Sequence, residues 1–343
     1  PVFLLVGLMA ASPLSCATSG AGRGGLLPPP LSRDDALARI LVLEDSRTLA
    51  DASIQAFLLS DDPAVRRRAA MAAGRIGDPL AVEGLVICLR DSSVEVRRTA
   101  ALALGLIGAP EGGAGLVKAL ADLDPLTRGR ASEALSRIGD ASFGPAIADA
   151  FRRALPRGAG KVLRIRGDDP GRADDPWVEL RLHLVALARL GNAEALASAV
   201  LGSDSMPVID WWAAVWAAMR VGDVQLTPVL LAGVEAEAPY IRSLAVRGLA
   251  RLQNPALLGT VRQMAKDPDP TVAAHALRAL AQIDFSVDGA LVAGLHVDSP
   301  NLVLRRGALL ALAALPPNPR LRSRVINNVG HPDPWIRSAA WPA

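Results

Sequence analysis

The sequence predicts an all-α fold, an α-solenoid of about eight to nine stacked two-helix repeats. Three observations support this prediction. Ala, Leu and Arg dominate the 343 residues, and these residues are strong helix formers. Aromatic residues make up only 3% of the chain, and alternating β-branched runs are missing, which excludes a large sandwich or barrel. Apolar positions also recur at intervals of 31 residues, as expected for a repeat architecture.

Charge and composition restrict the classes of ligand. The formal net charge is +3, and only Lys118, Lys161 and Lys266 among the 37 basic residues are lysines. Because the basic charge is not spread along the array, we expect no nucleic-acid partner. The four histidines are scattered and the two cysteines, Cys16 and Cys88, lie far apart. This spacing favours neither a disulfide framework nor a metal site, and we expect no cofactor.

Residues 1–17 are typical of an export segment. Residues 2–10 form an apolar run, too short for a membrane-spanning helix of about 20 residues, and small residues follow. Leu14, Ser15 and Cys16 resemble the lipobox of bacterial lipoproteins, in which the cysteine is lipidated, although Pro13 departs from that pattern. An ordinary cleavage site is the alternative. Residues 18–33 are rich in Gly and Pro and predict a flexible linker or membrane tether. We therefore expect an exported protein, periplasmic or anchored to a membrane as a lipoprotein facing the periplasm.

The 31-residue period organises residues 34–343. Val65, Val96 and Thr127 are 31 residues apart, and so are Ile76, Ile107 and Ile138, each of which precedes a glycine. The phase of the isoleucines returns later, at Leu190, Val221, Leu252, Ile283 and Ala314. The interval from Ile138 to Leu190 is 52 residues, 21 more than one period. One repeat therefore carries an insertion, which we place near 156–176.

Each repeat is predicted to form two antiparallel helices. The first helix follows an Asp-Pro pair at 62–63, 124–125 and 269–270, where the carboxylate caps the helix and proline fits its first turn. The position four residues after the Val65 phase is small in seven repeats: Ala69, Ala100, Ala131, Ala214, Ala245, Ala276 and Gly307. A second apolar-striped helix follows, for example over 79–89, 111–120 and 255–265. Stacking the repeats would bury these stripes continuously.

The pattern Asp-Pro-x-Val-Arg-x-x-Ala-Ala-x-Ala-x-Gly-x-Ile-Gly-Asp at 62–78 resembles the short HEAT repeat, of the subclass named for phycobilisome lyases. The resemblance covers about 36–343; it is strong at 62–140, fair at 238–315 and weak at 177–235. It implies a scaffold that binds a protein partner along a concave surface lined by the second helices. It implies no catalysis, because these repeats share no active site.

Two alternative functions follow from the same resemblance. Some bacterial exported proteins fuse such repeats to a cyclophilin-type domain, so the chain resembles the N-terminal targeting module of a periplasmic peptidyl-prolyl isomerase. Its catalytic domain would then lie beyond the chain end, and no catalytic residue can be assigned here. A chromophore lyase or chaperone, as in the phycobilisome proteins, is the other alternative. The export segment argues against it, since those proteins act in the cytosol.

Two clusters are candidate partner-binding residues. The first is a basic run without an intervening acid: Arg152, Arg153, Arg157, Lys161, Arg164 and Arg166. It could dock an anionic partner or lipid headgroups, or form a solvated loop partly neutralised by nearby aspartates. The second is aromatic and contains Trp211, Trp212 and Trp216, with the last two on one helix face. The rings of Trp212 and Trp216 either form a binding patch or are covered by the 156–176 insertion.

A structural ladder is predicted for the residues Asp62, Arg66, Arg97, Asp124, Arg128 and Arg242. We expect its arginines to pair with the cap carboxylates or with the turn of the next repeat, although such a row could also bind an acidic ligand. His183 occupies a small-residue position and predicts a loosened repeat rather than a catalytic or metal site. Cys88 is predicted to be a buried, reduced thiol.

Overall fold

The structure is a computed structural model that describes residues 31–47, 53–156, 162–166, 175–283 and 287–342. The export segment 1–17 with Cys16, and all of the linker except its last three residues, lie outside these ranges. So do Arg157 and Lys161 of the basic run.

The described residues form nine helix pairs followed by a single helix, which confirms the α-solenoid. The first helices of the pairs, with the unpaired α19, are α1 (Arg33–Ser46), α3 (Pro63–Ile76), α5 (Val94–Ile107), α7 (Pro125–Ile138), α9 (Val178–Leu190), α11 (Trp212–Val221), α13 (Pro239–Leu252), α15 (Pro270–Ile283), α17 (Leu302–Ala313) and α19 (Pro334–Ala340). The second helices are α2 (Ser53–Leu58), α4 (Val82–Cys88), α6 (Gly113–Ala119), α8 (Gly144–Ala154), α10 (Ala193–Val200), α12 (Thr227–Val234), α14 (Leu258–Met264), α16 (Val287–Gly294) and α18 (Arg322–Val329).

The first helices begin and end at the residues that the sequence predicts. The Asp62 carboxylate accepts a hydrogen bond from the Ala64 N–H at 2.8 Å, and Pro63 opens α3. Gly77 ends the helix at φ 82°, a left-handed conformation that costs little without a Cβ, and its N–H donates to the Ala73 carbonyl. Asp124 and Gly139 repeat this arrangement around α7.

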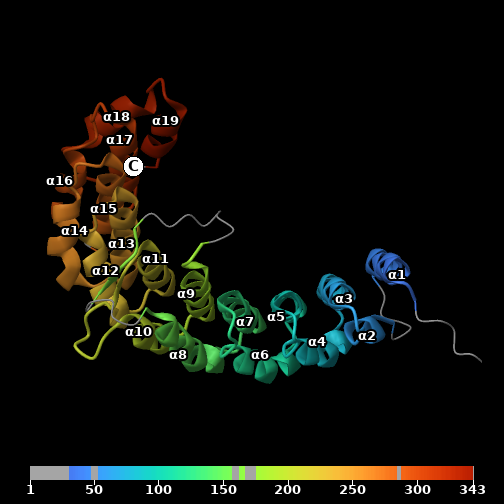
Figure 1. The fold of residues 1–343 in the computed structure, drawn as a ribbon. Helices are drawn as coiled ribbons and strands as arrows, with labels where there is room; N and C mark the ends of the chain where they lie inside the picture. The colour runs from blue at the N-terminus through green and yellow to red at the C-terminus, as the bar shows by residue number, and fades with distance from the viewer. Residues whose placement is uncertain (1–30, 48–52, 157–161, 167–174, 284–286, 343) are drawn as a thin grey trace, which may run out of the picture.

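The helix pairs stack into a curved array (Figure 1). First helices line the inner side of the curve, from α3 at one end to α17 at the other, and second helices line the outer side. The expectation that second helices line the concave surface is therefore wrong. The reason is steric. A Cβ on Gly74 would lie 2.7 Å from the Ala103 Cα, and one on Gly105 would lie 2.9 Å from the Ala134 Cα. Consecutive first helices also share more close residue pairs than consecutive second helices, and the stack bends toward them.

One apolar core extends through the whole array. It includes the small positions of the first helices, and Ala69, Ala100 and Ala131 have no exposed surface. Such residues leave room for the helix of the next repeat, so each repeat shields the stripe of its neighbour. None of the described helices has both the length and the apolar character that a membrane span requires.

The close approach of the first helices predicts opposite effects for two glycines. Gly74→Ala should lower the free energy of unfolding by about 1–3 kcal/mol, because the added methyl group meets the backbone of α5. Gly259→Ala in α14 should be neutral or stabilising by up to about 1 kcal/mol, because open space surrounds that position. Urea unfolding followed by circular dichroism measures both changes. Equal stabilities for the two variants would contradict this account of the curvature.

Candidate functional site

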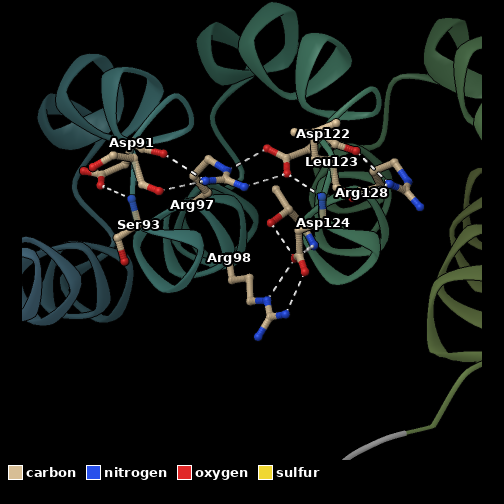
Figure 2. Close-up of polar contacts among 10 residues, drawn as sticks. Asp91, Ser93, Arg97, Arg98, Asp122, Leu123, Asp124 and Arg128 are labelled. Atoms are coloured by element: carbon tan, nitrogen blue, oxygen red, sulfur yellow. Dashed lines mark hydrogen bonds and ion pairs between the residues drawn. The ribbon is translucent and has the colours of Figure 1, made fainter.

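The arginine ladder connects consecutive repeats through bidentate ion pairs (Figure 2). Arg97 donates from Nε and Nη2 to the two carboxylate oxygens of Asp122, at 2.8 and 3.0 Å. Its Nη1 donates to the Asp91 carbonyl at 3.0 Å. The Asp122 carboxylate in turn accepts from the Asp124 N–H at 2.8 Å. The guanidinium group of Arg97 thus joins the turn before α5, which contains Asp91, to the turn before α7, which contains Asp122.

The same contact recurs along the chain. Arg66 pairs with Asp91, and Arg242 with Asp267, each across 25 residues. The hydrogen bond from Arg242 lowers the pKa of Asp267 below its usual value. In α17, Arg305 donates to the Asn328 amide oxygen at 2.6 Å, so a neutral acceptor replaces the carboxylate. These arginines therefore hold the turns of adjacent repeats together.

The cap carboxylates have other arginine partners. Asp124 accepts two hydrogen bonds from Arg98, at 2.7 and 2.9 Å, and Arg98 lowers the pKa of Asp124 to about 2. Asp62 lies 3.4 Å from Arg33. Of the two pairings expected for the ladder arginines, the structure contains the one with the turn of the next repeat.

The ladder is interrupted where the insertion enters. Position 153, which is 25 residues after Arg128, holds an arginine instead of an acid, and Arg128 pairs with Glu179 in α9. Trp211, which is 31 residues before Arg242, occupies the position of a ladder arginine. Its side chain is only 1% exposed, so it belongs to the core and not to a binding patch.

A buried polar network accompanies this interruption. Ser132 Oγ lies 2.7 Å from His183 Nδ1, and His183 Nε2 lies 3.3 Å from Glu179 Oε1. Serine, histidine and carboxylate are the groups of a hydrolytic triad. Here Ser132 and His183 have no exposed surface, and Glu179 is bound to Arg128, so no substrate can reach the serine. Burial lowers the pKa of His183, which keeps the ring neutral.

The described part of the insertion lies beside the tryptophan segment. Strand β1 (Leu163–Arg164) pairs in parallel with β2 (Ile209–Asp210), and Ile165 is buried. Trp211 packs edge to face on Trp212, with ring centroids 5.9 Å apart. Trp212 and Trp216 are half-buried and pack against the core. The described part of the insertion therefore lies beside the N-terminus of α11. Of the three tryptophans of this segment, Trp212 and Trp216 are partly exposed and Trp211 is buried.

The described members of the basic run do not form one patch. Arg152 donates to the carbonyls of Ser198 and Leu201. Arg164 and Arg166 both lie near the Asp210 carboxylate, at 3.8 and 3.3 Å. Arg153 is exposed near the end of α8. Three of these four arginines thus have local partners, as in a solvated loop whose charge is largely compensated.

Cys88 is a buried free thiol, and burial raises its pKa to about 11. The thiol is therefore protonated and weakly reactive at neutral pH. Among the described residues, no group of three or more His, Cys, Asp or Glu side chains is arranged to hold a metal ion.

One family model matches parts of the chain, and several solved structures resemble it. Residues 82–165 and 227–313 match a family model for HEAT repeats. Human deoxyhypusine hydroxylase in complex with glycerol is 20% identical and covers 80% of this chain and 97% of its own, with a TM-score of 0.30. The CpcE–CpcF complex of phycocyanin lyase from Nostoc is 19% identical and covers 94% and 100%, with a TM-score of 0.37. The Escherichia coli protein YibA is 14% identical and covers 82% and 97%, with a TM-score of 0.48. No curated protein sequence matches the chain.

Removal of a ladder arginine should destabilise the array. Arg97→Ala removes the guanidinium donor of the Asp122 carboxylate and of the Asp91 carbonyl, at a site where the Arg97 side chain is only 14% exposed. We expect a loss of about 2–3 kcal/mol in the free energy of unfolding, measured by urea denaturation. Arg97→Lys should recover only part of it, because an ammonium cannot form the bidentate contact. The control is Arg67→Ala, an exposed arginine of α3, and a comparable loss there would contradict the ladder's role.

The buried His183 predicts a loss of stability on mild acidification. Because its folded pKa lies below the unfolded value of about 6.5, the unfolded chain binds the proton more readily. The contribution of the neutral His183 to the free energy of unfolding is complete above about pH 6.5 and is lost as the pH falls below that value. Thermal unfolding between pH 7.5 and 5.5 should therefore depend more steeply on pH in the wild type than in His183→Gln. Identical pH dependence would contradict a buried neutral histidine.

Proposed function

This chain is a HEAT-repeat protein, and from that premise we propose that it is a non-catalytic scaffold that binds a protein partner along its concave surface. The observation that carries the proposal is the continuous inner row of first helices, held in register by the ladder. A surface shared by many repeats presents side chains over a long distance without a deep pocket, which suits recognition of another protein. The burial of the Ser132–His183 pair supports the non-catalytic assignment.

The sequence of residues 1–33 supports an exported location for this scaffold. An apolar segment, small residues and Cys16 followed by a Gly/Pro-rich stretch are the parts of a secreted and tethered protein. The proposal therefore includes a partner on the exported side of the membrane, with the array held near the surface by its N-terminus.

Site-specific photo-crosslinking in intact cells of the source organism tests the binding surface. A photoreactive residue is placed at two exposed positions of first helices, Leu106 in α5 and Gln282 in α15. The matched controls are exposed positions of second helices in the same halves of the array, Ile87 in α4 and Gln263 in α14. We expect a discrete adduct with another protein from the first pair and none from the second. Adducts restricted to the second helices, or no adduct at any position, would refute the proposal.

A further inference from the structure

Four exposed arginines from three consecutive first helices line one groove on the concave side. Arg220 comes from α11, Arg247 and Arg251 from α13, and Arg278 from α15. The groove has a volume of about 260 Å³, and the half-buried His275 lies in its wall. Ser243 Oγ lies 2.6 Å from His275 Nδ1, which fixes the orientation of the ring.

The positive charge of this groove is not compensated. Within the described residues, none of the four arginines has a carboxylate at ion-pair distance, and the sequences of α11, α13, α15 and α17 contain no Asp or Glu. The N-terminal half differs. There Glu44 binds Arg68 and Arg75, and Glu133 binds two arginines of α7. The positive charge of the groove also affects His275. Burial lowers the pKa of His275, and the nearby charges of Arg247 and Arg278 lower it further.

An apolar pocket continues the groove toward the C-terminus. His275 and Arg278 line both cavities. The second cavity, also about 260 Å³, lies among α15, α17 and α19, and its lining is mainly apolar, with Asp333 as its one acidic residue. Trp335 stands at its edge with 65% of its surface exposed, and Arg306 lies 5.1 Å from the ring centroid. A large exposed indole beside an apolar pocket is typical of a binding surface.

We propose that this groove binds an acidic peptide segment of a partner protein, with carboxylates on the four arginines and an apolar side chain in the pocket beside Trp335. Guanidinium groups bind carboxylates through paired, charge-assisted hydrogen bonds, which supplies the charge complementarity. A nucleic acid fits less well. Its phosphates would need basic residues along the whole array, whereas several arginines of the N-terminal half are bound to Glu44, Glu133 and Asp124.

The assignment rests on the proposed scaffold function and names the chemistry of the partner. The scaffold proposal and the acidic-peptide proposal can be refuted independently of each other. Crosslinking at Leu106 and Gln282 tests whether a protein occupies the concave side at all, whereas the peptide experiment below tests only the groove.

Fluorescence anisotropy with the purified chain and a labelled peptide tests the groove. The peptide contains four glutamates followed by leucine and phenylalanine. We expect binding that weakens at high salt and on replacing the glutamates by glutamine. Arg247→Ala/Arg278→Ala should weaken it at least about tenfold. The matched control, Arg67→Ala/Arg90→Ala, removes the same charge from exposed sites outside the groove and should leave binding unchanged.

The apolar pocket has its own readout. Trp335→Ala should weaken the peptide that ends in leucine and phenylalanine, but not a peptide that ends in two serines. Equal weakening by the control double variant, or no binding at millimolar peptide, would overturn the proposal. Tighter binding of a single-stranded RNA oligonucleotide that displaces the peptide would overturn it as well.

Discussion

The close contact between consecutive first helices determines the rest of this structure. Glycine and alanine at that contact let α3, α5 and α7 approach until a single added methyl group would meet backbone atoms of the neighbour. Consecutive second helices share fewer close residue pairs than consecutive first helices, and the array bends toward its first helices (Figure 1). The same contact therefore stabilises the stack and creates its concave surface. Interior packing of this kind tolerates little change in volume.

The arginine ladder adds register to this packing. Apolar contacts alone would permit adjacent repeats to slide or rotate, whereas a bidentate guanidinium–carboxylate pair has a defined geometry. Arg97 also donates hydrogen bonds to the carbonyl oxygens of Asp91 and Ser92 in the turn that precedes its helix (Figure 2). The half-buried guanidinium therefore links two turns that are far apart in the sequence. At the insertion the usual aspartate acceptor is missing, and Arg128 donates to Glu179 instead. Glu179 also contacts His183, so the buried network of Ser132, His183 and Glu179 accompanies this substitute ladder contact.

Capping residues made the helix ends predictable from the sequence, whereas contacts between residues far apart in the sequence were not predictable. Asp62, Pro63 and Gly77 act within a few residues, so their pattern predicts where α3 begins and ends. The side of the curvature depends on the relative spacing of two helix rows, which no single repeat encodes, and that prediction was wrong. The burial of Trp211 was missed, although its spacing from Arg242 indicates a ladder position. The phase also shifts before α17, where Arg305 lies 63 residues after Arg242, one more than two periods, so Ala314 is displaced from its expected place.

The two halves of the concave surface use the same residue type for different purposes. In α3, α5 and α7 several arginines pair with glutamates or cap aspartates, so much of their charge is neutralised within the fold. In α11, α13 and α15 the corresponding helices lack acidic residues, and Arg220, Arg247 and Arg278 remain exposed. Like charges on adjacent helices repel each other and do not stabilise the free array. A row of arginines that lowers the stability of the fold and has no acidic neighbours is best explained by a ligand of opposite charge.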